Sequence, residues 1–169
     1  VVSILGAGSG ELLRQYAIAG LIAWADGLLA GALELTAEYI RTRQQFGRPL
    51  CEFQGLQWKF AEMAIKLEGA QLLLYRAAAN ADRRLPSAYE TAIAKAACNQ
   101  AGFEVASEAV QIMGAMGYSQ DSLVEWCMRR CRGWMIAGGS IEILKNRIAE
   151  SIFDRRFDQR RPKPAEAAE

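Results

Sequence analysis

The sequence predicts an all-α fold, an up-and-down four-helix bundle with one short additional helix. The chain of 169 residues contains only four prolines, which separate long runs rich in helix-forming alanine, leucine, glutamate and lysine. Apolar residues within these runs recur at helical spacing, and no run shows the strict alternation of a half-buried strand. Short turns join the runs, as they join the helices of antiparallel bundles.

Five helices are expected, at residues 11–43, 53–82, 87–113, 123–134 and 141–157. The breaks between them read FGRPL, RRLPS, GAMGYSQDS and GGS, and each contains a proline or glycine that interrupts a helix. The opening residues 1–10 are expected to form a loop, and the polar tail 158–169 is expected to be disordered. Residues 11–157 would then form one bundle domain.

Each of the three long helices is supported by an apolar stripe at helical spacing. The stripe of the first helix is Leu29, Leu33, Ala37 and Ile40. The stripe of the second is Leu56, Phe60, Met63, Leu67, Ala70 and Leu74. The stripe of the third is Ile93, Ala97, Ala101, Val105, Ala109 and Ile112, whose small residues favour close helix packing. On the outer face of the second helix we expect Lys59, Glu62 and Lys66 to pair with one another.

The apolar stretch 16–35 could suggest a membrane span. However, Asp26 lies near its middle, and an acid at a bilayer centre costs about 2.5–3.5 kcal/mol on insertion scales. A small-residue face is available for packing against another helix, formed by Gly20, Gly27 and Gly31. We therefore expect a buried bundle helix without a membrane span, covered in part by protein beyond this chain.

The composition excludes several classes of chemistry. The chain contains no histidine, which excludes Ser-His-Asp and Cys-His catalysis and histidine-ligated metal sites. The formal net charge of +1 gives no electrostatic argument for a nucleic-acid partner. The cysteines, Cys51, Cys98, Cys127 and Cys131, lack a disulfide-rich spacing, and no metal site is expected. They are expected to be ordinary buried thiols of a cytoplasmic protein.

Four local patterns could carry chemistry: RTRQQFGRPL at 41–50, FQGLQWKFAEM at 53–63, AVQIMGAMGYS at 109–119 and IAGGSIEILKNRIAE at 136–150. Ser140 can cap the last helix, whose N-terminus favours an anion, although every helix needs a cap of this kind. Arg43 and Phe46 offer a charge beside an aromatic ring, but equally fit a solvated arginine and a core phenylalanine. Taken singly, none of these patterns decides a function.

Together and in this order, the four patterns resemble the C-terminal domain of the acyl-CoA dehydrogenase family. The resemblance covers nearly all of residues 11–157, and its most specific elements are R-x-x-F-G, Q-I-x-G-x-x-G-Y and G-G-S-x-E-I. It implies a four-helix bundle that lies against an N-terminal helical domain and a middle β domain and builds a tetramer core. It also implies FAD bound between domains and across a subunit interface.

The resemblance assigns cofactor-binding roles to individual residues. It implies that Arg43 reaches the FAD pyrophosphate of a neighbouring subunit, with Phe46 beside it and Gln54 in the same nucleotide site. It implies that Gln111 and Gly114 receive the adenosine end, with Ala115 replacing a common glycine. It implies that Ser140 and Glu142 lie near the flavin of their own subunit. The implied reaction is α,β-dehydrogenation of an acyl-CoA thioester, in which a glutamate removes the α proton and the flavin accepts the hydride.

The sequence departs from the family where the catalytic glutamate is expected. The usual position corresponds to Gly138, and the alternative position on the first helix corresponds to Ala17. Asp26 lies about 13 Å and Glu11 about 9 Å along the helix axis from Ala17 at 1.5 Å per residue, and Glu142 belongs to another motif position. None of these acids is assigned as the base, so the catalytic residue is left unknown.

Three interpretations remain open besides a plain helical scaffold with no ligand. The chain is the C-terminal part of a working acyl-CoA dehydrogenase, a non-catalytic structural subunit of a heteromeric complex, or a member with related chemistry such as reduction or elimination at a CoA thioester. Because the chain starts where the family's middle domain ends, we expect a fragment of a longer polypeptide or a subunit completed by another chain. The expected partners are an acyl-CoA substrate and a homo-oligomer, dimer or tetramer, or a hetero-oligomer with a related subunit.

Overall fold

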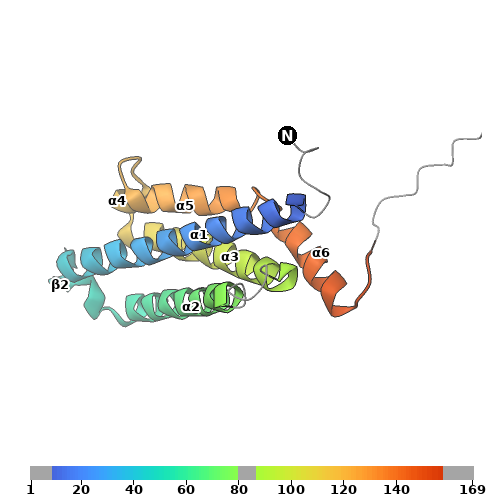
Figure 1. Ribbon diagram of the computed structural model, residues 1–169. Coiled ribbons are helices and arrows are strands. Elements are labelled where there is room, and N and C mark those ends of the chain that lie inside the picture. Colours follow the sequence, from blue (N-terminus) through green and yellow to red (C-terminus); the bar gives the residue numbers. More distant parts are fainter. Residues whose placement is uncertain (1–8, 80–86, 158–169) are drawn as a thin grey trace, which may run out of the picture.

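The computed structural model describes residues 9–79 and 87–157, with side chains in the first helix only at residue 22 and from residue 26 onward. Long helices run along one another as a bundle, and the last described helix, residues 141–152, lies across one end of it (Figure 1). The predicted all-α bundle is therefore confirmed. No described helix is both long enough and apolar enough to cross a membrane.

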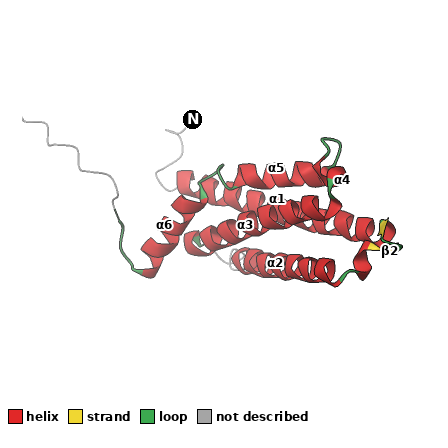
Figure 2. Cartoon of the chain, turned by 180° about the vertical axis from the view of Figure 1, so that it is seen from behind, coloured by secondary structure: helices red, strands yellow, loops and turns green. Residues whose placement is uncertain are grey.

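The elements follow one another along the chain with short connections. The helices are α1 (Ser9–Thr42), α2 (Gln54–Ala79), α3 (Ala88–Met113), α4 (Ala115–Tyr118), α5 (Leu123–Trp134) and α6 (Ile141–Ile152). A 3-10 turn, η1 (Leu50–Glu52), precedes α2. Two short antiparallel strands, β1 (Gln44–Gln45) and β2 (Arg48–Pro49), form a hairpin between α1 and η1. Figure 2 shows this hairpin and α6 at opposite ends of the bundle.

The central helix is α3, which packs against α1, α2, α5 and α6. Its small side chains let the other helices approach, as the sequence indicated, and Ala94, Ala106 and Ala109 are completely buried. The largest apolar cluster joins α1, α2, α3 and α5 around Leu29 and Val105. A separate cluster fixes α6 to the first half of α3 through Ile141 and Leu144. The position of α6 therefore depends on α3.

Several predicted boundaries differ from the structure. The first helix begins at Ser9, and the last ends at Ile152 because Asp154 adopts a left-handed backbone with φ of 46°. The predicted loop GAMGYSQDS contains α4. The hairpin was not expected, since two residues per strand are too short to show a period. The predictions for residues 1–8, 80–82 and 158–169 lie outside the described residues.

The ion pairs of α2 join it to α3 and do not run along α2. Lys59 bonds Glu108, and Lys66 bonds Glu104. The expected pairing of Lys59 and Lys66 with Glu62 on their own helix is therefore not what the structure shows. Cross-helix partners were closer because α3 presents its two glutamates beside this face of α2.

Asp26 on α1 carries a predicted pH effect. Burial raises the pKa of Asp26 above the ordinary value of 3.8. A 3.3 Å hydrogen bond from Gln71 Nε2 lowers the pKa, but the effect of burial is larger. A carboxyl with a raised folded pKa contributes stability below pH 3.8 that is lost as the pH rises through the folded pKa. Asp26→Asn cannot ionise, so we expect it to be more stable than the wild type at pH 7, with the difference shrinking towards pH 4.

Urea denaturation between pH 4 and pH 8 measures this difference. The control is Asp121→Asn, because Asp121 is exposed in the turn before α5. A stability gain for Asp26→Asn that did not grow with pH would contradict the assignment of a buried, hard-to-ionise carboxyl.

Candidate functional site

The hairpin brings three of the predicted cofactor residues to one end of the bundle. Arg43 follows α1 directly, and its carbonyl accepts a 2.9 Å hydrogen bond from the Leu50 N–H, which closes the hairpin. Phe46 and Gly47 form the tip with φ of 54° and 78°, both positive as type I′ turns require. Phe46 is 93% exposed, and its ring lies edge-on to the Phe53 ring with 6.2 Å between the two ring centroids. The alternative of a core phenylalanine is therefore wrong.

The second group of predicted residues lies where α3 ends. Gly114 ends the helix with φ of 60° and ψ of −137°, and its N–H donates to the Gln111 carbonyl. Ala115 begins α4 with helical backbone, so the replacement of a common glycine there needs no special conformation. Gly117 cannot be replaced freely for a different reason, because a Cβ there would lie 2.8 Å from Met113 Cβ and 2.9 Å from the Val110 carbonyl oxygen.

The third group lies at the connection between α5 and α6, which we call the glycine loop (residues 135–140). Gly138 and Gly139 have φ of 67° and 101°, which favour glycine. The Ser140 hydroxyl caps α6 by accepting from the Ile143 N–H at 3.5 Å. The backbone N–H groups of Gly138, Gly139 and Ser140 donate to no oxygen of the described residues. These donors and the N-terminus of α6 favour an anion.

The side chain that holds the glycine loop was missed from the sequence. Lys95 of α3 is completely buried, and its ammonium donates to the carbonyls of Ala137 at 3.0 Å and Gly139 at 2.7 Å. Its contact with the Trp134 carbonyl is longer, at 3.4 Å, and Asn99 Nδ2 donates to the same oxygen at 2.9 Å. The available signal was a lysine in the small-residue run AIAKAA, with an amide one turn later.

The three groups of predicted cofactor residues lie in two places. The hairpin residues and the residues where α3 ends share one end of the bundle, and the glycine loop lies apart from them. Gln111 and Lys95 are 16 residues apart on α3, which is about 24 Å at 1.5 Å per residue. The hairpin group, with Arg43, Phe46 and Gln54, lies at the end of the bundle where α3 finishes, and the glycine loop lies beside Lys95 (Figure 1). One copy of the chain does not bring all of them around a single small molecule.

Electrostatics distinguish the acids near these groups. The pKa of Glu142 is lowered by its own backbone N–H and by the Ser140 hydroxyl, with Lys145 and Arg132 contributing. Glu142 is exposed at the start of α6 and is therefore a carboxylate at neutral pH, in the role of a helix-end charge. Gly138 carries no side chain, and the side chains of Ala17 and Glu11 lie outside the described ones. The Asp26 carboxylate accepts a hydrogen bond from Gln71 of α2, and its charge acts on the Cys98 thiol of α3.

Two of the thiols, Cys98 and Cys131, offer no alternative nucleophile. Burial raises the pKa of Cys131 to about 12, and burial together with the charge of Asp26 raises that of Cys98 to about 12. A thiol with so high a pKa stays protonated at neutral pH and is unreactive. In the described part of the chain, no group of three potential metal ligands occurs either.

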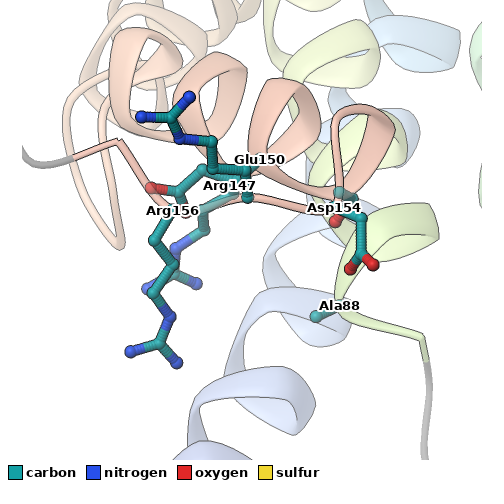
Figure 3. Close-up of a pocket in the computed structure, with 7 residues that line it drawn as sticks. Ala88, Arg147, Glu150, Asp154 and Arg156 are labelled. Carbon is teal, nitrogen blue, oxygen red and sulfur yellow. The ribbon is translucent and has the colours of Figure 1, made fainter.

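A further hollow of about 660 Å³ lies between the end of α6 and the start of α3. Three arginines line it, Arg147, Arg155 and Arg156, together with Glu150 and Asp154. Figure 3 shows the guanidinium groups pointing in different directions and not converging on one point. This hollow is an open, mixed-charge surface and lacks the geometry of an anion site.

The residues present fit a dinucleotide cofactor as two half-sites. The hairpin group offers a guanidinium, an amide and an exposed aromatic ring, which suit a diphosphate and a base. The glycine loop offers free backbone donors without a side chain at Gly138, which suit close approach of a planar ring system. In one copy of the chain the two half-sites lie at different places along the bundle.

Comparisons with known proteins identify the family of this domain. Residues 17–153 match the family described as "Acyl-CoA dehydrogenase, C-terminal domain". The chain is 40% identical over 157 residues to a 3-sulfinopropanoyl-CoA desulfinase of Paraburkholderia xenovorans (strain LB400), which covers 92% of this chain and 40% of the relative. It is 37% identical over 134 residues to the short-chain specific acyl-CoA dehydrogenase of Clostridium acetobutylicum, covering 79% and 35% of the two.

A solved structure supports the same assignment. Butyryl-CoA dehydrogenase from Megasphaera elsdenii superposes with a TM-score of 0.79 at 33% identity, covering 83% of this chain and 37% of that one. The chain thus spans less than half the length of the relatives that it matches. From the family match, the identities and the superposed bundle, the chain belongs to the acyl-CoA dehydrogenase family and corresponds to its C-terminal domain.

Proposed function

We propose that this chain is the C-terminal part of a cytoplasmic flavoprotein that acts on an acyl-CoA thioester by α,β-dehydrogenation. In this proposal it contributes to FAD binding, lines part of the acyl-CoA pocket and joins subunits. The proposal is supported by the placement of the residues proposed to bind the cofactor in two groups, at the hairpin and at the glycine loop, which are about 24 Å apart along α3. A single FAD reaching both kinds of half-site requires an oligomer.

The chain's own residues would perform binding and orientation. Arg43 would hold the diphosphate with charge-assisted hydrogen bonds, and Gln54, Gln111 and the backbone at Gly114 would receive the nucleotide end. Ser140 and the free N–H groups of the glycine loop would face the flavin, near which Glu142 keeps a negative charge. FAD, when bound, would supply the hydride acceptor.

An exposed apolar stripe on α2 supports the assembly. Trp58, Ile65 and Leu72 recur at seven-residue spacing on one face of the helix, and all three are exposed in the single chain. Contiguous apolar surface of this kind marks protein–protein contacts. A homo-oligomer is the simpler partner, and a hetero-oligomer with a related subunit is the alternative.

A second candidate reaction is favoured by the missing acid. Gly138 and Ala17 replace the carboxylates that would remove an α proton, and one relative is a desulfinase. Loss of a sulfinate group from carbon 3 of 3-sulfinopropanoyl-CoA with water gives propanoyl-CoA and hydrogensulfite. The C–S bond breaks, carbon 3 gains a proton and the electron pair, and sulfur gains the hydroxyl. This reaction needs no net hydride acceptor and no oxidant.

The protein expressed from its complete reading frame separates these possibilities. Bleaching of oxidised flavin by acyl-CoA substrates of several chain lengths supports dehydrogenation. Release of sulfite from 3-sulfinopropanoyl-CoA without bleaching supports desulfination. Bound FAD with neither reaction supports a non-catalytic subunit, and a purified protein without flavin contradicts the proposal.

We predict that Arg43→Ala weakens FAD binding. A charge-assisted hydrogen bond contributes about 1.5–3 kcal/mol, so the dissociation constant should rise about 10- to 100-fold. Because Arg43 is exposed, the melting temperature of the apoprotein should stay the same. Fluorescence titration with FAD measures the effect.

The matched control is Arg41→Ala, which removes an exposed arginine two residues earlier at the same helix end. Equal losses for the two variants would indicate a general charge effect and contradict a specific role for Arg43.

A further inference from the structure

Lys95 is surrounded by the carbonyl oxygens of one loop. Its ammonium has three N–H donors and lies within hydrogen-bonding range of Gly139, Ala137 and Trp134, the last at 3.4 Å. Among the described residues, no carboxylate forms an ion pair with it. A buried charge without a counter-ion is costly unless hydrogen bonds compensate it. The hydrogen bonds to these carbonyls therefore stabilise the buried Lys95 ammonium.

The glycine loop has few other anchors. The N–H groups of Met135, Ile136 and Ala137 donate back to carbonyls of α5, and the Ile141 N–H donates to the Met135 carbonyl. The Met135 side chain packs against the apolar cluster of α3 and α6, which leaves residues 137–140 with the fewest anchors. Gly138 and Gly139 have no side chains, so their backbone can adopt many conformations besides the one in the structure. Without a contact to the rest of the protein, the segment would sample several conformations. Lys95, with Asn99 one turn later, supplies that contact from α3.

We propose that Lys95 is a positioning residue, which clamps the glycine loop so that Gly138, Ser140 and the entry of α6 face the reacting part of the bound ligand. With its donors directed at the loop carbonyls, Lys95 serves neither as a base nor as a ligand contact. Asn99 completes the clamp through its bond to Trp134. The inference about turnover rests on the proposed function, whereas the inference about loop order does not.

The test compares Lys95→Met with the wild type in the protein from the complete reading frame. Methionine keeps most of the side-chain length and removes the charge and all three donors. Hydrogen exchange of the Ala137 and Ile141 amides should become at least tenfold faster in the apoprotein, while exchange of the α2 amides stays the same. The flavin-loaded enzyme should retain FAD through Arg43, and its kcat should fall about 100-fold with KM within threefold.

Two further variants make the test decisive. Lys66→Met is the matched control, since it makes the same chemical change at the exposed ion pair with Glu104 and should alter neither quantity. Asn99→Ala removes only the donor to the Trp134 carbonyl, at the end of α5 directly before the loop. It should accelerate exchange about threefold, so it reports on the clamp even if Lys95→Met does not fold.

Unchanged exchange of Ala137 and Ile141 in both clamp variants would overturn the inference. So would a uniform rise across all helices, which would mean a general loss of stability, or loop release without loss of kcat. A wild type that holds no flavin and turns over no thioester would overturn the proposed function, but the exchange experiment would still decide whether Lys95 orders the loop.

Discussion

Gly117→Ala is expected to destabilise the protein by about 1–3 kcal/mol, the usual cost of forcing an extra methyl group into a packed site. The new Cβ would lie 2.8 Å from Met113 Cβ, 2.9 Å from the Val110 carbonyl oxygen and 3.0 Å from Val110 Cα. Two of these atoms belong to the backbone of α3, so a side-chain rotation cannot relieve the clash. Instead α4 must move away from the end of α3.

That movement also has a functional consequence. Gln111 and Gly114 lie at the end of α3, directly before α4. Displacement of α4 should therefore weaken FAD binding and also lower the free energy of unfolding. Urea denaturation gives the first quantity and FAD titration the second. The control is Gly69→Ala, which makes the same change at an exposed position of α2 with nothing within 4 Å of the new Cβ. Alanine should stabilise that helix by up to about 1 kcal/mol. Equal effects at the two positions would contradict the close contact at Gly117.

Gly138→Glu is expected to create or strengthen acyl-CoA dehydrogenation. It places a carboxylate where the family resemblance expects the catalytic base, and general base catalysis contributes about 10²–10⁴-fold. The backbone there has φ of 67°, so any side chain costs about 1–2 kcal/mol of stability. Anaerobic bleaching of the flavin by an acyl-CoA measures the rate.

The matched control is Gly138→Gln, which has the same size and the same backbone cost but no ionisable carboxylate. The glutamate variant should bleach the flavin at least 100-fold faster than the glutamine variant. If the two rates are equal, the side chain at position 138 does not face the α carbon, and the alignment of this position with the family's glutamate is wrong.

Local patterns were enough to predict the helices and several of their ends. The apolar stripes of α1, α2 and α3 are buried or half-buried as expected, and Ser140 caps α6 as its position indicated. These features depend on neighbours a few residues away. The short hairpin and the end of α6 at Ile152 were not predicted, because they depend on positive φ values at Phe46 and Asp154, residue types for which such values are uncommon.

Contacts between distant parts of the chain could not be predicted. The sequence offered Glu62 as a partner for Lys59 and Lys66, but which helix would lie beside α2 was decided by packing. Lys95 was not singled out, because a lone lysine in a helix is usually solvated and its acceptors are carbonyls that any residue could supply. The residues of the candidate site could therefore be named from the sequence. Their division between two ends of the bundle was visible only in three dimensions.

The Lys95 clamp has a consequence for the order of folding. Lys95 and Gly139 are 44 residues apart in sequence, whereas the contacts that form the hairpin after α1 span fewer than ten. Closing a long segment costs entropy before its contacts form, and contacts across the bundle pay this cost as well, since Lys59 and Glu108 are 49 residues apart. The clamp also needs α3 and α5 already packed side by side, so its contacts form late. We expect the bundle to reach its transition state while the glycine loop is still unordered. Clamp mutations should then leave the folding rate unchanged and act on unfolding, so cofactor competence would be the last property that the folding chain acquires.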